Sequence, residues 1–251
     1  MRIGSVPYLN ARPLVDGLAR HPPAGYALTY ATPAVLIARL LAGELDIAMA
    51  SSFAALAHPE LTLLREMGVT NIGPAWSVRL FSRVPPAEIR TLALDTGSRS
   101  SVAMARIILA ERYGAQPACR PAAPELAAML AVADAAVLIG DIGLTVAADE
   151  MLVLDLGAEW HTLTGLPFFF AGWMARDAAV LAEAAPVLRA SLAAGLARLE
   201  AIAAAEAVRL GIPAARCYAY LHDVMRYHAG EAEWAGLAAF RDRAVRWGLL
   251  P

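Results

Sequence analysis

The sequence contains no lysine, so all 21 of its basic residues are arginines. The absence of lysine excludes imine chemistry, including pyridoxal-phosphate attachment, and it excludes the lysine of a phosphate-binding P-loop. Acidic residues number 23, and the formal net charge is −2. A chain of this charge has no strong basic field to hold a nucleic-acid backbone, and we expect no nucleic-acid partner.

Metal-ligating and cofactor-binding motifs are also lacking. The two cysteines, Cys119 and Cys217, are far apart, and the five histidines have no metal-ligand spacing. We therefore expect reduced thiols and no metal site. Neither a Gly-x-Gly-x-x-Gly motif nor a Gly-x-Ser-x-Gly motif is present, which argues against a nicotinamide, a flavin or a hydrolase nucleophile elbow.

A long uninterrupted hydrophobic run is absent, although 59% of the 251 residues are hydrophobic and mean hydropathy is +0.51. A bilayer span needs roughly 20 continuous apolar residues. Charges interrupt the apolar stretches 131–144 and 178–210, and the uncharged stretch 166–175 is only strand length. Met1 and Arg2 run directly into a predicted strand without an apolar leader. These features predict a cytoplasmic protein with a large core and no membrane partner.

Short apolar runs alternate with amphipathic segments over the first 175 residues, which predicts an α/β fold with mainly parallel sheets. The predicted strands are 2–6, 26–30, 45–50, 78–82, 91–95, 135–139 and 152–156, and the predicted helices are 12–20, 33–42, 51–57, 100–113 and 125–132.

The pattern changes after Arg176, where strand signals stop and helices are expected at 178–210, 213–228 and 231–247. Pro186 is expected to break the first of these helices or to mark its true start. The turn-rich segment 83–86 and the segment 165–175 are predicted to be crossings between two lobes. They divide the chain into a discontinuous lobe 1, residues 1–82 plus 176–251, and a lobe 2, residues 83–175.

Small polar residues follow several predicted strands, where ligands bind in open α/β sheets beside helix N-termini. The segment Thr96-Gly97-Ser98-Arg99-Ser100-Ser101 combines a turn glycine, hydroxyls and an arginine that can bind a carboxylate. Ser51, Gly140 and Asp141 occupy equivalent tips. Each tip taken alone favours an ordinary helix cap, and local sequence indicates that Asn10 is a cap and Ser77 a strand-edge hydroxyl. Taken together, these polar strand ends predict a site that binds an anion, but they do not identify the anion.

Several segments, in order along residues 3–173, resemble the chorismate dehydratases of the futalosine route to menaquinone. Tyr8-Leu9-Asn10-Ala11-Arg12-Pro13-Leu14 resembles their opening "YLNxxPL". The other matching segments are Gly73–Ser82 ("GPxxSVxLFS"), Ser98–Val102 ("SRTSV"), Asp134–Asp141 ("DAxLLIGD"), Asp155–Trp160 ("DLGxxW") and 164–173 ("TGLPFVFAxW"). One departure follows the third strand, where "VPSxE" is replaced by Met49-Ala50-Ser51-Ser52-Phe53, which leaves Ser51 as a possible substrate contact.

The resemblance implies the two-lobed, periplasmic-binding-protein-like (type II) fold, with C-terminal helices and the substrate in an interlobe cleft. It implies a hydro-lyase that converts chorismate to 3-[(1-carboxyvinyl)oxy]benzoate and water without metal or organic cofactor. It also places Asn10 and Ser77 in the active site as catalytic residues.

The implied reaction removes the C3 proton and the C4 hydroxyl of chorismate. Proton loss first would give a carbanion that the ring carboxylate delocalises, and helix N–H groups at Thr96–Ser101 would stabilise that charge. The enolpyruvyl carboxylate of the substrate is one candidate base, and Asp141 is the other.

Two other functions are open to this sequence. A non-catalytic cytoplasmic binding protein for a small carboxylate would use the same fold and strand tips. The sister enzyme dihydroxynaphthoate synthase opens with a segment of the form "SPCPNDTF", which is absent here.

Overall fold

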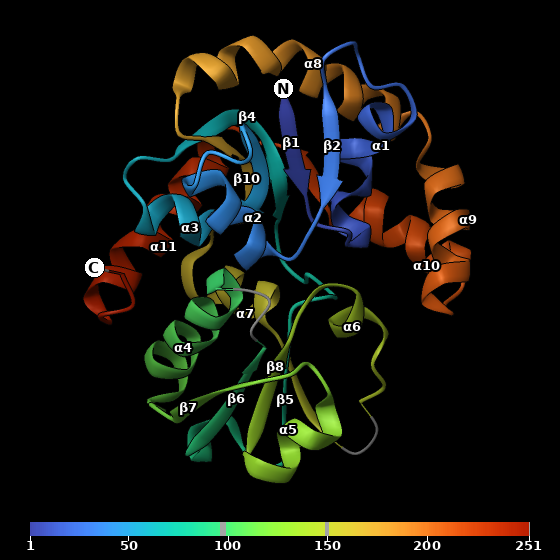
Figure 1. Ribbon diagram of the computed structural model, residues 1–251. Coiled ribbons are helices and arrows are strands. Elements are labelled where there is room, and N and C mark those ends of the chain that lie inside the picture. The colour runs from blue at the N-terminus through green and yellow to red at the C-terminus, as the bar shows by residue number, and fades with distance from the viewer. Residues whose placement is uncertain (96–98, 149–150, 251) are drawn as a thin grey trace. The chain divides into compact units, whose positions relative to one another are not determined.

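The computed structural model (Figure 1) describes residues 1–95, 99–148 and 151–250, and the chain divides into two compact units. Unit 1 comprises Met1–Thr70 and Phe169–Glu231, and unit 2 comprises Asn71–Phe168 and Ala232–Pro251. Each unit is built around its own sheet, as the predicted α/β class requires.

Unit 1 contains a six-stranded mixed sheet in the order β11-β4-β10-β3-β1-β2. Strand β1, next to the edge strand β2, is parallel to both β2 and β3, and β10 is antiparallel to β3. All five residues of β3 are buried, which matches their continuous apolar character. The strand bounds are Arg2–Ser5 (β1), Ala27–Tyr30 (β2), Ile47–Ser51 (β3), Thr62–Asn71 (β4), Phe168–Ala175 (β10) and Arg226–His228 (β11).

Helices of unit 1 pack on this sheet and on one another. One core cluster joins Leu36 and Leu40 of α2 with Ala54 of α3 and with Ala48 and Met174 of the sheet. The helical bounds are Leu9–Ala11 (η1, a 3-10 turn), Arg12–Arg20 (α1), Pro33–Leu41 (α2), Ser52–Ala57 (α3), Ala178–Leu196 (α8), Leu199–Leu210 (α9), Ala214–Ala219 (α10) and Tyr220–Val224 (η3, a π-helical turn).

Helix α8 lies against α1 because two glycines let their backbones meet (Figure 1). An ideal Cβ on Gly17 would lie 2.6 Å from Ser191 Cα, and one on Gly195 would lie 2.7 Å from the Pro13 carbonyl carbon. Ser191 Oγ also accepts from Leu18 N at 3.0 Å and donates to Leu14 O at 2.9 Å. Among the described residues, α8 is the one helix long and apolar enough to cross a membrane, a test that core helices also pass.

Unit 2 contains a five-stranded sheet in the order β7-β6-β8-β5-β9. Strand β6 is parallel to β7 and β8, whereas β5 is antiparallel to both β8 and β9. The strand bounds are Arg79–Ser82 (β5), Thr91–Asp95 (β6), Ala118–Ala122 (β7), Ala135–Leu138 (β8) and Leu152–Asp155 (β9).

The helices of unit 2 are held partly by aromatic packing. Trp160, Phe168 and Phe240 form edge-to-face pairs with centroids 4.9 to 6.0 Å apart, which fixes α11 to α7. Glu111 of α4 accepts from Arg243 Nε and from Trp247 Nε1, each at 3.0 Å. The helical bounds are Pro86–Glu88 (η2), Arg99–Tyr113 (α4), Leu126–Val132 (α5), Gly140–Thr145 (α6), Leu156–Thr164 (α7) and Glu231–Arg246 (α11).

The structure confirms the predicted strands and helices of the first 175 residues to within a few residues at each end. It adds β4, β7, β10, α6 and α7, which the sequence analysis did not predict. The expectation that strands stop after Arg176 is wrong, because β11 is a strand at the sheet edge and the predicted helix 213–228 ends before it.

The predicted helix 178–210 is divided into α8 and α9, but not at the predicted residue. Pro186 neither breaks α8 nor starts it, because α8 begins at Ala178 behind the N-cap Asp177 and continues through the proline. Pro186 is exposed within the helix, and the chain breaks instead at Ala197 and Arg198.

The unit boundaries of the structure also differ from the division at 82/83 and 175/176. Strand β5 pairs only with β8 and β9 of unit 2, whereas β10 pairs with β3 of unit 1. Strand pairing therefore places the crossings near residues 70 and 168, and the third boundary, after Glu231, assigns α11 to unit 2.

Candidate functional site

The candidate residues of unit 1 lie at the carboxyl edge of its parallel strands. Asn10 belongs to the turn η1, which follows β1, and Ser51 is the last residue of β3. Because β1 and β3 are parallel neighbours, both residues lie beyond the same edge of the sheet, where α/β folds bind ligands.

Asn10 is half-buried and is not a helix cap. The N-cap of η1 is Tyr8 and that of α1 is Ala11, so the capping role suggested by local sequence is wrong. Within the described part of the chain, no hydrogen bond involves the Asn10 side-chain amide. Its donor and acceptor therefore remain available to a ligand.

Ser51 occupies the N-cap position of α3, but its hydroxyl makes no capping hydrogen bond. The residue is 9% exposed, and its Oγ has no hydrogen-bond partner among the described residues. A buried polar group without a partner costs free energy and calls for an explanation. The neighbouring Ser52 differs, because its Oγ donates to Phe169 O at 2.6 Å.

The candidate residues of unit 2 also gather at one sheet edge. Arg79, the first residue of β5, pairs with Leu138, the last residue of β8, because the two strands are antiparallel. Ser77 therefore lies at the edge where the parallel strands β6 and β8 end. The sequence pattern could not reveal this, since it does not give the direction of β5.

Arg99, Ser100 and Ser101 form the first turn of α4, which follows β6 at this edge. Ser100 and Ser101 are buried, whereas Arg99 is exposed. Their backbone N–H groups belong to the positive end of a 15-residue helix. The other predicted members of this segment, Thr96, Gly97 and Ser98, lie outside the described residues.

Gly140 and Asp141 open helix α6 after β8. Gly140 has φ +60°, a left-handed conformation that favours glycine. The N-cap of α6 is Ile139, so the alternative that Asp141 is the cap is wrong; Asp141 is the half-buried second residue of the helix. The structure thus brings Asp141 to the same sheet edge as Ser77.

Asp155 is a residue of this edge that the site prediction missed. Its two carboxylate oxygens accept from the backbone N–H groups of Ala75 (2.8 Å) and Trp76 (2.7 Å), directly before Ser77. The signal was present in the sequence, since Asp155 opens the "DLGxxW" segment, but its contact with a loop 80 residues away was not visible there.

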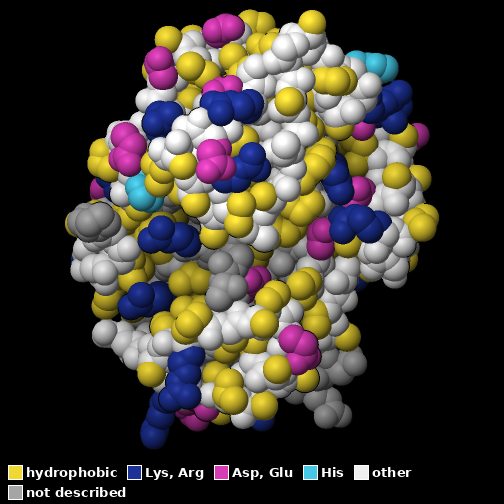
Figure 2. All heavy atoms as spheres, in the orientation of Figure 1, with side chains coloured by type: hydrophobic (Ala, Val, Ile, Leu, Met, Phe, Trp, Pro, Cys, Tyr) yellow, Lys and Arg dark blue, Asp and Glu magenta, His cyan; other side chains and the backbone are white. Residues whose placement is uncertain are grey.

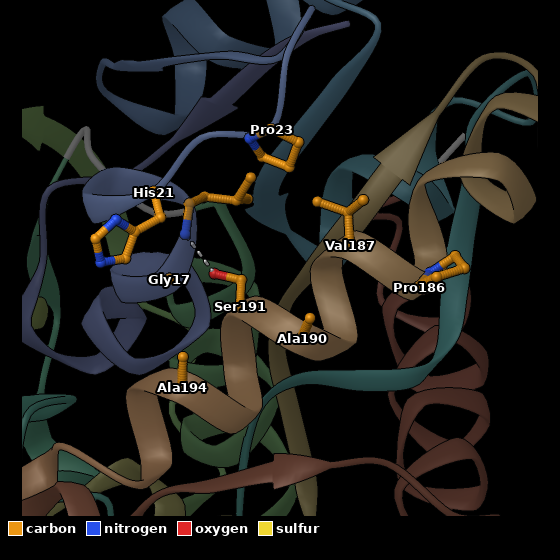
Figure 3. Close-up of a pocket in the computed structure, with 9 residues that line it drawn as sticks. Gly17, His21, Pro23, Pro186, Val187, Ala190, Ser191 and Ala194 are labelled. Carbon is orange, nitrogen blue, oxygen red and sulfur yellow. Dashed lines mark hydrogen bonds between the residues drawn. The ribbon is translucent and has the colours of Figure 1, made fainter.

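Unit 1 also has two cavities, and neither is lined by Asn10 or Ser51. The larger, about 390 Å³, lies between α1 and α8 and is lined by mostly apolar side chains, with His21 and Pro23 near one side and Val187 and Ala190 on the other (Figure 3). The smaller, about 170 Å³, is lined in part by the ion pairs Arg12–Glu206 and Arg198–Asp16.

The charged side chains show no large patch of one sign on the face drawn in Figure 2, where arginines and acidic residues alternate. Across residues 1–95, 99–148 and 151–250, no three His, Cys, Asp or Glu side chains are grouped as a metal site would require.

Comparison with solved structures defines the class of protein. The chain is similar to protein AF1704 from Archaeoglobus fulgidus, with a TM-score of 0.78, 16% identity and coverage of 99% of this chain and 98% of that one. It is also similar to the periplasmic aliphatic sulphonate binding protein SsuA from Escherichia coli, with a TM-score of 0.67, 18% identity and coverage of 100% and 88%. The fold is therefore the two-lobed, periplasmic-binding-protein-like type II α/β fold.

Sequence comparison identifies the family within that class. Residues 1–246 match the family described as "Menaquinone biosynthesis". The chain is 33% identical to the chorismate dehydratase of Thermus thermophilus over 96% of its own length and 93% of that protein. The chain belongs to this menaquinone-biosynthesis family, in agreement with the resemblance drawn from its motifs.

Proposed function

We propose that this chain is a chorismate dehydratase, a hydro-lyase that converts chorismate to 3-[(1-carboxyvinyl)oxy]benzoate and water in menaquinone biosynthesis. The observation that carries the proposal is the 33% identity to the Thermus enzyme over nearly the whole of both chains. The polar residues at the two sheet edges support it, because they are the ones that the family motifs single out.

In unit 1, Asn10 is proposed to hold the C4 hydroxyl that leaves as hydroxide. Its amide has both a donor and an acceptor, and no described residue occupies either. Ser51 is proposed to donate its hydroxyl hydrogen to a substrate carboxylate. Such a bond would satisfy the buried Oγ, which has no partner within the described chain.

In unit 2, Ser77 is proposed to hold a substrate carboxylate, with Gly140 and Asp141 beside it at the strand ends. Loss of the C3 proton leaves a carbanion that the ring carboxylate delocalises, and loss of C4 hydroxide then yields the aromatic ring. The N–H groups of Ser100 and Ser101 at the start of α4, together with the Arg99 guanidinium, are proposed to stabilise the developing negative charge.

The base for C3 is proposed to be the enolpyruvyl carboxylate of chorismate itself, positioned by the protein. Asp141 is the competing candidate. Asp141→Asn separates the two: near-normal turnover supports the substrate base, and loss of turnover with substrate still bound contradicts it.

The direct test is to incubate the purified chain with chorismate alone and to quantify the benzoate product by chromatography. We expect turnover without added metal or cofactor, and about 100-fold or greater loss of kcat/KM in Asn10→Ala and Ser77→Ala, because misplaced or missing polar contacts at a reacting centre cost about this much. If correctly folded wild-type protein forms no product, the proposal is contradicted.

The second candidate is a non-catalytic binding protein for a small carboxylate. It would use the same fold, which the periplasmic aliphatic sulphonate binding protein SsuA also has. Chorismate binding measured by calorimetry, without product formation over hours, would select this function.

A further inference from the structure

The loop that precedes Ser77 is held by one carboxylate. Asp155 Oδ1 accepts from Ala75 N at 2.8 Å, and its Oδ2 accepts from Trp76 N at 2.7 Å. The same Oδ1 also caps helix α7 by accepting from Gly157 N at 3.0 Å and Ala158 N at 3.1 Å. Asp155 therefore joins the end of β9, the start of α7 and the loop in one set of four hydrogen bonds.

The residue between that carboxylate and Ser77 has a strained backbone. Trp76 has φ +58°, and among the described residues it is the one non-glycine with a positive φ. A bulky side chain rarely adopts this conformation, and such strain persists only where surrounding contacts impose it. The hydrogen bond from Trp76 N to Asp155 is such a contact. Next to it, Ser77 N donates to Ala75 O at 2.6 Å, which closes the turn.

Close packing leaves the turn little room to relax. An ideal Cβ on Gly157 would lie 2.6 Å from Gly73 O, and one on Gly143 would lie 3.0 Å from the Ser77 carbonyl carbon. Arg79 holds the Gly143 segment by donating from Nε to Gly143 O at 2.5 Å. The backbone of Ser77 is thus enclosed by α6 on one side and tied through the loop to α7.

We propose that Asp155 is a positioning residue for Ser77: its carboxylate imposes the left-handed turn at Trp76, and that turn sets the place of the Ser77 hydroxyl. The inference rests on the proposed function, in which Ser77 contacts the substrate. It assigns a role to the opening residue of the "DLGxxW" segment, which the proposed chemistry does not use.

The test is Asp155→Asn, compared with Asp134→Asn as the matched control. Asp134 also accepts two backbone N–H groups, those of Arg90 (3.0 Å) and Thr91 (2.9 Å), in the same unit. In Asp155→Asn we expect kcat to fall about 10- to 100-fold, the range that a small misplacement of a reacting group produces. Asp134→Asn, with a similar loss of thermal stability, is expected to keep kcat within about twofold of wild type, since it leaves that geometry intact.

A second substitution tests whether Asp155 acts on Ser77 through the backbone strain at Trp76. Asn tolerates the left-handed conformation, so Trp76→Asn removes most of the strain that Asp155 offsets. We expect the fold-loss in kcat caused by Asp155→Asn to be at least about threefold smaller in a Trp76→Asn background, as for residues that are coupled. If Asp155→Asn lowers kcat by the same factor in the wild-type and Trp76→Asn backgrounds, the strained turn at Trp76 is not the means by which Asp155 positions Ser77.

Hydrogen exchange of the Ala75 and Trp76 amides gives a readout that does not depend on turnover. We expect both amides to be protected in the wild type and in Asp134→Asn and to exchange faster in Asp155→Asn. Unchanged protection in Asp155→Asn, or lost protection with wild-type kcat, would overturn the inference. If the wild type does not convert chorismate, the proposed function fails, and the exchange result alone still decides whether Asp155 holds the loop.

Discussion

Two adjacent serines at the end of β3 show how different neighbouring residues can be. Ser52 Oγ donates to Phe169 O at 2.6 Å and ties α3 to β10, whereas the buried Ser51 Oγ has no partner in the described chain. The first hydroxyl thus has a structural explanation within the protein. The second one has none, which is why we assign it to the substrate.

This contrast predicts opposite effects for Ser51→Ala and Ser52→Ala. Ser51→Ala removes no internal hydrogen bond, so we expect the free energy of unfolding to stay within about 0.5 kcal/mol of wild type. A lost bond to a charged carboxylate should lower kcat/KM about 10-fold or more. Ser52→Ala should instead destabilise the fold by about 1 kcal/mol or more, because the Phe169 carbonyl loses its buried partner.

Urea unfolding and steady-state turnover of the two variants check this prediction. If Ser51→Ala destabilised the fold as much as Ser52→Ala while leaving kcat/KM unchanged, the hydroxyl would have a structural role and no substrate contact.

At the residue scale, the sequence was enough to place some of the candidate residues at a sheet edge but not others. Ser51, Gly140 and Asp141 follow strands that were predicted, so their place at a sheet edge could be deduced. Ser77 could not be placed by the same reasoning, because it precedes a strand and reaches the edge only through the antiparallel direction of β5. Asp155 depends on a contact between segments 80 residues apart.

At the scale of elements, three of the strands that the sequence analysis missed have weak apolar signals. Strand β4 carries Arg65 and Glu66 in its middle, β7 is mostly exposed and contains Pro121, and β11 has only three residues. Edge strands are partly solvated, so they lack the continuous apolar pattern of buried parallel strands. The sheet order places both β7 and β11 at edges.

The packing of α8 on α1 predicts a large effect for Gly195→Ala. The added methyl group would overlap the Pro13 carbonyl, a backbone group that cannot move aside without shifting α1. We expect destabilisation of about 1–3 kcal/mol from this overpacking. Ala193→Ser, on the exposed side of the same helix, should change stability by no more than about 0.5 kcal/mol.

Thermal and urea unfolding of Gly195→Ala and Ala193→Ser measure the difference. If the two variants have the same free energy of unfolding, α1 and α8 can move apart at this crossing without a cost in stability.

The hydrogen bonds between Asp134, directly before β8, and Thr91, at the start of β6, predict a pH dependence of stability. The Thr91 hydroxyl, with the backbone N–H groups of Arg90 and Thr91, lowers the pKa of Asp134 below its ordinary value. A carboxyl whose pKa is lower in the folded state stabilises the fold above its unfolded pKa of about 3.9, and this stabilisation is lost as pH falls through the folded pKa. Asp134→Asn should therefore cost stability at pH 7 and progressively less below about pH 4.

Urea titrations of wild type and Asp134→Asn at pH 7, 4.5 and 3 test this, with the exposed Glu88→Gln as the control. A stability difference that stays constant over this pH range would contradict the assignment of the lowered pKa to Asp134.

At the scale of the whole molecule, the high mean hydropathy of +0.51 reflects both a large buried core and alanines on helix surfaces. Helix α8, which is apolar enough to resemble a membrane span, contacts α1 through Gly195 and Ser191 and carries Glu183 and Arg189 on exposed positions. A charge within a span costs free energy in a bilayer, whereas alanine on a helix surface is well tolerated in water.

We therefore predict that the chain does not insert into lipid. In flotation with vesicles of phosphatidylcholine and phosphatidylglycerol, the protein should stay in the aqueous fraction at low and high salt. Loss of the protein to the floated vesicles at high salt, where electrostatic attraction is screened, would show that apolar surface binds lipid. If Gly195→Ala floats and the wild type does not, the packing of α8 on α1 is what keeps that apolar surface inside the fold.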